Sequence, residues 1–357
     1  MNLFDEVERA RQGVGKSAGG KPAGRGGKPE TAESAGATGV TGAAKSLFIA
    51  DFKAGTVIDE TFYCTDAAVR LGARSKYLHA QLVDRSGSIV CRMWDVDDAV
   101  LAHISQGSYV RVQAAVETYQ DKPQLVIRKV RKLDPSEVLA GEYLPCSKFD
   151  ADKMADEFWA LIKQLPAGEY KTAIEAVFSN EVIWPRFRLA PAASMNHHAW
   201  IHGLLEHTLN IMRSVALYEQ VHPELKLDMV MAGVAFHDIG KAWELEAQPG
   251  LSYTDEGMLL GHINIGFMVV DTVLREVPAV SAKARMMIGH MILSHHGTRE
   301  FGSPVTPMFP EAIAVHHLEC LDAKLQGVRT AMDNADPNLH WTPKVMMADG
   351  NRVFKDY

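Results

Sequence analysis

Histidines and carboxylates stand on apolar helical stripes in the second half of the sequence, where leucine would be expected. Leu204, His207 and Ile211 fall on one stripe, and His237 and Asp238 end the next. Five predicted helices therefore each turn a metal-capable group inward. The other three stripes are Leu259, His262 and Ile265; Ile288, Met291 and His295; and Val315, Leu318 and Asp322.

A metal centre explains this group of side chains better than core packing does. A single histidine on an apolar face is usually a core residue that bonds a backbone carbonyl. Burying several imidazoles and two carboxylates together without a cation would cost on the order of several kcal/mol in desolvation. Nitrogen and carboxylate donors without cysteine suit Mn²⁺, Fe²⁺, Co²⁺ or Zn²⁺, and residue types alone do not choose among these ions.

Helices must position these groups. The stretch "DADKMADEFWALIKQL" opens with aspartates suited to a helix N-terminus. Helical periodicity then recurs as far as residue 331. We expect an all-α domain at 151–335, with a linker at 136–150 before it and a C-terminal extension at 336–357 after it. The periodic stretches are 201–220, 228–239, 258–276, 281–295 and 310–331.

Residues 46–135 carry strand patterns instead. "KYLHAQLVD" and "SIVCRMWD" flank the turn sequence "DRSG", and "SYVRVQAAVETY" and "PQLVIRKVRKL" flank "QDKP". A short helical stretch, "DVDDAVLAHI", separates the two pairs. Three strands, a helix and two more strands predict a small five-stranded barrel of the OB type. The fold class is thus multidomain, with an all-β barrel followed by an all-α domain.

Aromatic and basic residues of the barrel are candidates for binding nucleic acid. Such barrels bind single strands by stacking bases on aromatics while a basic groove follows the phosphates. Core packing is the alternative for each aromatic taken alone. The candidates are Tyr63, Tyr77, Trp94 and Tyr119, with Arg70, Arg74, Lys76, Arg92, Arg128 and Lys129.

Charge is distributed unevenly along the 357 residues. Residues 1–132 carry 19 basic and 15 acidic side chains, and the remainder carries 18 basic and 29 acidic. An acidic second half would repel nucleic acid unless its carboxylates hold cations or the first half delivers the substrate. This favours a division of labour between the two domains.

The N-terminal residues, the length of the apolar runs and the cysteines limit the class of protein. Residues 1–45, rich in Gly, Ala, Ser and Lys, are expected to form a flexible arm, although "NLFDEVERARQ" could be a short amphipathic helix that docks on a partner. The first residues lack an apolar signal core, and no apolar run approaches the ~20 residues of a membrane span. The four scattered cysteines suggest neither disulfides nor a thiolate zinc site. We expect a cytoplasmic protein with no membrane partner.

The motifs resemble a known family. The order His207, His237-Asp238, Asp322 is similar to the H…HD…D signature of HD-domain metal-dependent phosphohydrolases. "HHAWIHGLLEHTLNI", "FHDIGK", "GHI", "SHHG" and "LDAK", behind an OB-type barrel, resemble YhaM-like 3′→5′ exoribonucleases over about residues 46–330. His202 departs from the family pattern, which has a small residue such as glycine there.

The resemblance implies two divalent ions, with Mn²⁺ favoured and Fe²⁺, Co²⁺, Zn²⁺ or Mg²⁺ as alternatives. Asp238 would bridge them, since a carboxylate has two oxygens, and the pair would lower the pKa of a shared water and stabilise displacement at phosphorus. Lys241 could reach a phosphate oxygen, although a solvated lysine is its rival interpretation. One ion would be held by His207, His237, Asp238 and Asp322, and the second by His262, His295 and His296.

The remaining histidines receive lesser roles. His197 and His198 precede the His207 helix and are expected to contact substrate or donate a proton to the leaving oxygen rather than to coordinate metal. We expect packing or hydrogen-bonding roles for His316 and His317. His296 is the weakest of the implied ligands, because it could instead orient its neighbour.

The predicted function is a metal-dependent 3′→5′ exonuclease that releases nucleoside 5′-monophosphates from single-stranded RNA, with single-stranded DNA as a further substrate. Two alternatives remain open. One is an HD nucleotide phosphohydrolase acting on free (d)NTPs or signalling nucleotides, and the other is a nucleic-acid-binding regulator with a structural metal site. The sequence also leaves open a homo-oligomer and a protein partner for the N-terminal arm.

Overall fold

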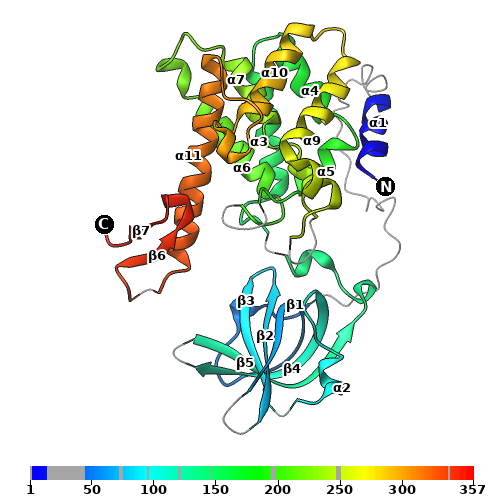
Figure 1. Ribbon diagram of the computed structural model, residues 1–357, viewed down its shortest axis with the longest axis vertical. Coiled ribbons are helices and arrows are strands. Elements are labelled where there is room, and N and C mark those ends of the chain that lie inside the picture. The colour runs from blue at the N-terminus through cyan, green and yellow to red at the C-terminus, as the bar shows by residue number, and fades with distance from the viewer. Residues whose placement is uncertain are drawn as a thin grey trace, which may run out of the picture. The chain divides into compact units, whose positions relative to one another are not determined.

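The computed structural model divides into two compact units (Figure 1). One unit is a β-barrel that extends through Cys146. The other is a helical domain formed by the N-terminal helix together with the residues from Ser147 onward. The predicted order of a five-stranded barrel followed by an all-α domain is confirmed. The described residues are 2–13, 45–71, 75–94, 96–119, 122–144, 146–193, 198–246, 251–336 and 338–357.

The barrel closes in the strand order β1-β2-β3-β5-β4. Alternating residues point inward, and Phe62, Leu78, Cys91 and Val112 are among those buried in its core. The other face of each strand is therefore free to carry polar and aromatic groups. The elements are β1 (Val57–Leu71), β2 (Lys76–Asp84), β3 (Gly87–Trp94), α2 (Asp98–Leu101), β4 (Ser108–Tyr119) and β5 (Lys122–Leu133).

Both boundaries of the barrel differ from the sequence prediction. Lys45, placed in the flexible arm, is buried, and its Nζ donates to the carbonyl of Thr61 at 2.6 Å. Tyr143, placed in the linker, is also buried, and its hydroxyl bonds the Thr61 hydroxyl at 2.6 Å. Residues beyond the last strand pack back onto the barrel through buried apolar contacts, so the linker is shorter than predicted. Three 3₁₀ turns complete this unit: η1 (Ile49–Asp51), η2 (Pro135–Glu137) and η3 (Ala140–Glu142).

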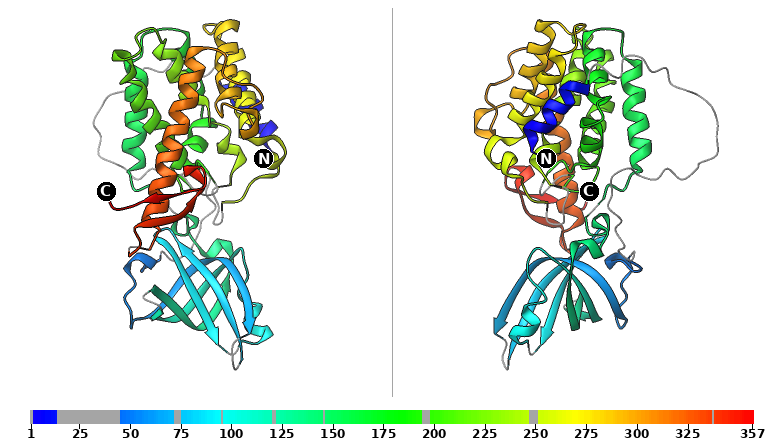
Figure 2. Two further views of the ribbon diagram at one scale, coloured as in Figure 1. Left: turned by 60° about the vertical axis from the view of Figure 1, so that its left-hand side comes forward. Right: turned by 90° about the vertical axis from the view of Figure 1, so that its right-hand side faces the viewer.

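The helical domain surrounds one large apolar core. The predicted helices are present, and two shorter ones, α4 and α5, complete an aromatic cluster in which Phe178 and Phe236 stack at 5.6 Å. Figure 2 shows α11 running along one side of this bundle. The helices are α3 (Ala151–Gln164), α4 (Glu169–Phe178), α5 (Ile183–Leu189), α6 (Gly203–Val215), α7 (Leu227–Phe236), α8 (Lys241–Glu244), α9 (Asp255–Arg275), α10 (Ala282–Ser294) and α11 (Pro310–Asp333), with turns η4 (Tyr218–Gln220) and η5 (Arg299–Phe301).

The N-terminal helix α1 (Leu3–Gly13) belongs to the helical domain. Its buried Glu6 accepts from Arg186 Nη2 at 2.5 Å and from the Trp243 indole at 2.8 Å. The flexible arm predicted for residues 1–45 is therefore wrong for this helix, because its apolar side and Glu6 find partners in the same chain. Residues 14–44 of the predicted arm lie outside the described residues.

The C-terminal extension forms a β-hairpin that the sequence patterns did not predict. Strands β6 (Trp341–Val345) and β7 (Asn351–Phe354) pair antiparallel around the turn η6 (Met346–Ala348). The hairpin packs on the C-terminal half of α11.

Among the described residues, α9 has the length and composition of a membrane-crossing helix. The expectation that no apolar run approaches the length of a membrane span overlooked this helix. Half of its most apolar window is buried in the helical domain, and a core helix passes the same test. Its backbone also breaks at Gly261, where φ is 70°.

Candidate metal centre

The turn after α7 brings the His-Asp pair into the core. Helix α7 is buried along most of its length and ends at Phe236, so His237 and Asp238 follow directly from an apolar helix. Gly240 allows the next turn to press against α9, because a Cβ there would lie 2.0 Å from the carbonyl oxygen of His262. The sequence "FHDIGK" thus places a histidine and a carboxylate where four helices meet.

Asp238 directs its two carboxylate oxygens to different sets of donors. Oδ1 lies 3.5 Å from Nε2 of His262 and 3.5 Å from Nε2 of His295. Oδ2 lies 3.3 Å from Nε2 of His237 and 3.6 Å from Nε2 of His207. Asp238 therefore faces two groups of potential metal ligands.

The first set of donors lies on the Oδ1 side of Asp238. His262, His295 and His296 have ring nitrogens within 4.8 Å of one another and of Asp238. His295 donates from Nδ1 to the Ile292 carbonyl, so its Nε2 lone pair faces the cluster. His296 is held in the same way by a bond from Nδ1 to the Phe301 carbonyl, at 2.7 Å.

The second set lies on the Oδ2 side. His207 Nδ1 is 2.7 Å from Oδ2 of Asp322, and His237 Nδ1 donates to the Val234 carbonyl at 2.7 Å. Each ring therefore turns Nε2 toward the other, and these two nitrogens lie 3.2 Å apart. Two neutral imidazoles would oppose lone pairs at this distance, so a cation, either a proton or a metal ion, must hold them together.

Unsatisfied atoms show that the cluster fits divalent ions. Asp238 Oδ1, His262 Nε2 and His295 Nε2 are buried and have no hydrogen-bond partner among the described residues. Buried polar atoms are almost always paired, and these three converge on one another. Imidazole nitrogens and carboxylate oxygens are common ligands of Mn²⁺, Fe²⁺, Co²⁺ and Zn²⁺.

Protonation states also suit metal binding. Burial lowers the pKa of His207 and of His296 to about 4, and lowers that of His295 well below its usual value. Burial opposes the charge of Asp238, but Lys241 and His237 outweigh it and hold its pKa well below the usual range. At neutral pH these imidazoles expose lone pairs and the carboxylate is ionised, as metal ligands must be.

Lys241 points into the cluster rather than toward solvent. Its side chain is buried, and Nζ donates to Asp238 Oδ2 at 2.7 Å. Burial opposes its charge, but the carboxylate of Asp238 raises its pKa. The rival interpretation of a solvated lysine is wrong for this structure.

His198 lies deeper than its place in the sequence led us to expect. It is fully buried, and its Nε2 lies 3.2 Å from Asp322 Oδ2, the same oxygen that bonds His207. A buried ring in this position orients Asp322 and belongs to a potential ligand group, so an exposed role as substrate contact or proton donor does not fit it. His197 lies outside the described residues.

The turn before α6 explains the unusual His202. Its φ is 67°, a left-handed conformation that glycine adopts without strain, which suits the small residue expected at this position. Here the ring Nδ1 bonds the Arg188 carbonyl at 2.6 Å. Gly203 follows because a Cβ would lie 2.0 Å from the His198 carbonyl oxygen.

Sequence reasoning missed the groups that orient these ligands. Glu244 accepts from the backbone N–H of His262 at 2.9 Å and bonds its Nδ1 at 3.1 Å. The break at Gly261 frees this N–H. The motif "GHI" includes Gly261 and His262, but no motif marked Glu244. Glu319, on α11, was also missed, and burial raises its pKa to about 7. His316 donates to the His295 carbonyl at 2.7 Å, as expected of a supporting residue, whereas His317 is exposed.

The outer face of the barrel gathers part of the predicted nucleic-acid-binding set. Tyr77 pairs across the strands with both Arg70 and Trp94, so the three share one face, and the two rings lie 5.1 Å apart. Arg92, two residues before Trp94, lies over the Tyr119 ring at 4.4 Å. Trp94 is 48% exposed and Tyr119 46%, so neither is a core residue.

Other predicted barrel residues lie apart from this face. Tyr63 packs edge-on against Tyr109 at 5.2 Å, in a small apolar cluster with Leu133. Lys76 is exposed at the start of β2. Arg128 and Lys129 are exposed on β5, beyond the last residue that pairs with β3. Arg74 lies outside the described residues.

Comparison with known proteins matches both domains. Residues 63–133 match the OB-fold nucleic acid binding domain, and residues 204–324 match the HD domain. The 3′-5′ exoribonuclease YhaM of Listeria innocua is 28% identical over 307 residues, which cover 85% of this chain and 96% of that protein. The YhaM of Bacillus subtilis is also 28% identical, over 84% of this chain and 95% of its own length. The chain is a homologue of the YhaM proteins. The resemblance inferred from the YhaM-like motifs is thereby confirmed, and it spans the barrel and the helical domain together.

Proposed function

We propose that this YhaM homologue is a divalent-metal-dependent 3′→5′ exonuclease that acts on single-stranded RNA and releases nucleoside 5′-monophosphates. Asp238 carries the proposal, because its two oxygens face two sets of buried histidine donors. The names of the relatives, 3′-5′ exoribonucleases, support the substrate and the direction of attack.

Six side chains would hold two ions, with Mn²⁺ favoured. His207, His237 and Asp238 form one set, and His262, His295 and His296 form the other, with Asp238 between them. Asp322, the seventh predicted ligand, lies beside Nδ1 of His207 and would orient that ring. Such ions stabilise the charge that develops on a phosphate and lower the pKa of water.

Neighbouring residues prepare these ligands. Lys241 fixes Asp238 through Oδ2 and adds a positive charge beside the phosphate site. His198 holds Asp322, and Glu244 holds His262 through two bonds. These contacts reduce the conformational freedom of the ligands before substrate arrives.

The barrel would supply the preference for a polynucleotide. Tyr77, Trp94 and Tyr119 offer rings for base stacking, and Arg70 and Arg92 beside them offer charges for phosphates. Polynucleotide binding of this kind does not depend on sequence.

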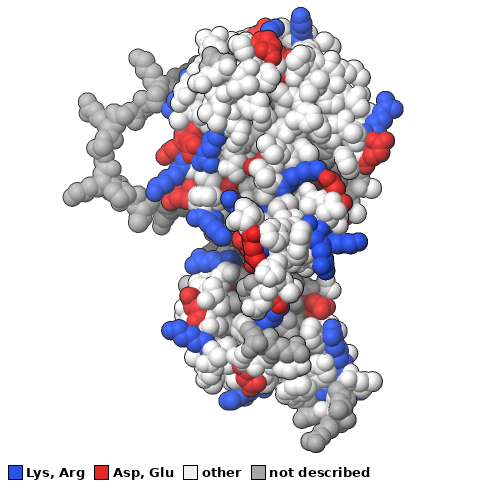
Figure 3. Space-filling model, turned by 90° about the vertical axis from the view of Figure 1, so that its left-hand side faces the viewer, with Lys and Arg blue, Asp and Glu red and all other residues white. Residues whose placement is uncertain are grey.

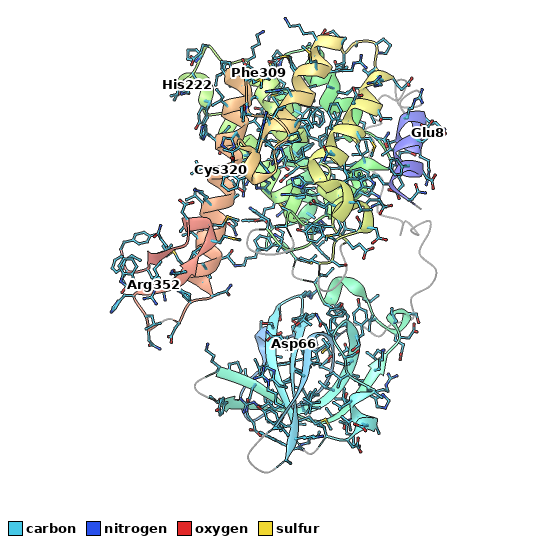
Figure 4. All side chains as sticks on the ribbon, in the orientation of Figure 1. Glu8, Asp66, His222, Phe309, Cys320 and Arg352 are labelled. Atoms are coloured by element: carbon cyan, nitrogen blue, oxygen red, sulfur yellow. The ribbon has the colours of Figure 1, made fainter. Side chains whose placement is uncertain are left out.

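Incubation with 5′-labelled single-stranded RNA and Mn²⁺ tests the activity. We expect progressive shortening from the 3′ end, with loss of activity in His237→Ala and on addition of chelator. His222→Ala is the matched control, because His222 is exposed and belongs to none of the potential metal-binding groups (Figure 4). Absence of shortening, or shortening that persists in His237→Ala with chelator, would refute the proposal.

Hydrolysis of free nucleotides is the second candidate, because all six donors come from the helical domain. The double variant Tyr77→Ala/Trp94→Ala separates the two functions. An exonuclease that depends on the barrel should lose affinity for RNA, whereas turnover of a free nucleotide should not change.

A further inference from the structure

The C-terminal hairpin carries two aromatic and two basic side chains on one face. Trp341 lies opposite Phe354, and Lys344 lies opposite Arg352. Opposite residues of an antiparallel pair share a face, as do residues two apart on one strand, such as Arg352 and Phe354. All four side chains therefore project from the same side, which we call the outer face.

This face is open to solvent. Trp341 is 49% exposed and Phe354 41%, and their rings lie 5.1 Å apart. Lys344 and Arg352 are also exposed. Figure 4 marks Arg352 on the hairpin, and Figure 3 views the molecule from the side on which the hairpin lies.

The two cations have no partner within the described part of the chain. Neither Lys344 nor Arg352 makes an ion pair or a side-chain hydrogen bond there. The nearby acids are already engaged, Asp349 with Lys324 at 3.2 Å and Asp356 with His340. Like charges directly opposite each other destabilise a hairpin. An anionic ligand bound beside the two cations would relieve this repulsion, and the relief would contribute to the free energy of binding.

Helix α11 holds the opposite face of the hairpin in place. Val345 is buried, and a Cβ on Gly327 would lie 2.5 Å from Met347. Lys355 Nζ donates to the Asp336 carbonyl at 2.6 Å. The outer face is therefore presented on a fixed support.

The same helix also presents the metal centre. Asp322 precedes Thr330, which lines a groove of about 450 Å³ between α11 and the hairpin, and Val345 and Met347 line the groove from the other side. Eight residues of helix correspond to about 12 Å along the axis. Thr330 and Asn334 add hydrogen-bonding groups to this groove.

We propose that the outer face of the hairpin binds single-stranded RNA, with bases stacked on Trp341 and Phe354 and phosphates bound by Lys344 and Arg352. The proposal rests on the proposed exonuclease function and adds a second substrate-binding surface, on the helical domain itself. Exposed aromatics beside unpaired cations are the combination by which proteins bind single strands without reading sequence.

Affinity of the full-length protein for a fluorescent oligouridylate tests the surface. Binding is measured by anisotropy in chelator, over a range of salt concentrations. Lys344→Gln/Arg352→Gln should weaken binding and make the slope of log K against log salt shallower by about 1.4, or 0.7 for each phosphate contact. Trp341→Leu and Phe354→Leu should each weaken binding roughly fivefold or more, with no change in slope.

Two control variants lie close by. Lys324→Gln removes one exposed cation that pairs with Asp349, and Tyr357→Ala removes an exposed terminal aromatic. Both should bind RNA with nearly the wild-type affinity. The double glutamine variant also relieves like-charge repulsion, so its melting temperature should not fall.

Several results would overturn the proposal. One is that the outer-face variants bind RNA with the affinity and salt dependence of the wild type. Another is that binding weakens only in variants whose melting temperature also falls, which would indicate a structural role for these side chains. A loss of binding to phosphatidylserine vesicles with unchanged RNA binding would assign the face to a membrane instead. Binding is measured in chelator and shortening is measured in Mn²⁺, so the two proposals can fail separately. Wild-type protein that binds RNA through the hairpin but does not shorten RNA in Mn²⁺ would refute only the exonuclease function.

Discussion

Lys45 in the barrel and Asp238 in the helical domain are both buried, but their surroundings differ. Lys45 donates to the Thr61 carbonyl, lies within 3.5 Å of Asp84 and 3.9 Å of Glu60, and sits 3.7 Å from the centre of the Phe62 ring. The two carboxylates in turn accept hydrogen bonds from backbone and hydroxyl donors.

Completeness of hydrogen bonding distinguishes the two sites. In the described part of the chain, the side-chain atoms of the Lys45 cluster all have partners, whereas around Asp238 one carboxylate oxygen and two imidazole nitrogens have none. A closed network binds nothing further and holds the barrel together. The unpaired oxygen and nitrogen atoms around Asp238 indicate a site that can bind a cation. Breaking the open network should therefore abolish activity, whereas breaking the closed one should lower stability.

Asp238→Asn should have the largest effect. Removing the carboxylate between the two sets of donors should lower RNA shortening roughly 10³-fold or more, because several kcal/mol of charge stabilisation are lost and each ~1.4 kcal/mol is tenfold. Initial rates with labelled RNA and Mn²⁺ measure the change, and metal content per chain reports occupancy. Activity within tenfold of wild type would contradict a bridging role for Asp238.

Lys45→Met should destabilise the barrel without impairing the metal centre. Asp84 and Glu60 would remain buried without their cation, and breaking such an ion pair costs roughly 3–5 kcal/mol. Hydrogen exchange resolved by peptide should show faster exchange in β1 and β2, while hydrolysis of a small phosphodiester stays constant. An unchanged exchange rate would mean that the closed network around Lys45 contributes little to the stability of the barrel.

Acid should destabilise the metal-free helical domain. The His207 ring takes up a proton near pH 6.5 in the unfolded chain but only near pH 4 in the folded one. Between these values the unfolded state binds more protons, so stability falls as the pH falls, by about 1.4 kcal/mol per pH unit for this residue. Urea unfolding at a series of pH values, in chelator, measures the slope. A flat profile over this window would show that His207 is already charged in the folded state.

Asp59→Asn should have the smallest effect. Its carboxylate accepts from Arg111 Nε at 2.7 Å on the barrel surface, where both side chains are about half exposed. Exposed pairs contribute less than about 1 kcal/mol. Thermal unfolding of Asp59→Asn, compared with that of Lys45→Met, would separate the contribution of a buried charge to stability from that of an exposed ion pair. An equal loss of stability in the two variants would contradict that distinction.

Periodicity and turn residues were enough to predict most of the fold. Strand β2 has the bounds of "KYLHAQLVD", and the helices that carry the metal-capable groups lie where helical spacing placed them. The hairpin was missed because "WTPKV" and "NRVF" are short, and a proline interrupts the first. The packing site of helix α1 was not predicted, because its partners, Arg186 and Trp243, are distant in sequence.

Residue types predicted the members of the candidate site better than their roles. Six of the seven predicted ligands lie in the two groups around Asp238, since a stripe on a helix fixes the direction of a side chain, whereas Asp322 lies beside Nδ1 of His207. The role of His198 depended on the left-handed backbone at His198 and His202, which no sequence pattern indicates. Glu244 depended on the break at Gly261, so its contact with His262 could only be seen in three dimensions.

The docking of α1 sets the order in which the chain can fold. This helix is synthesised before the barrel, yet Arg186 and Trp243, which donate to Glu6, are synthesised after it. The barrel can fold before α1 finds its partners, so the helical domain is completed after the barrel, around an element made before it. A shortened chain that begins at Ser147 would lack that element and would leave Arg186 and the Trp243 indole without their carboxylate partner.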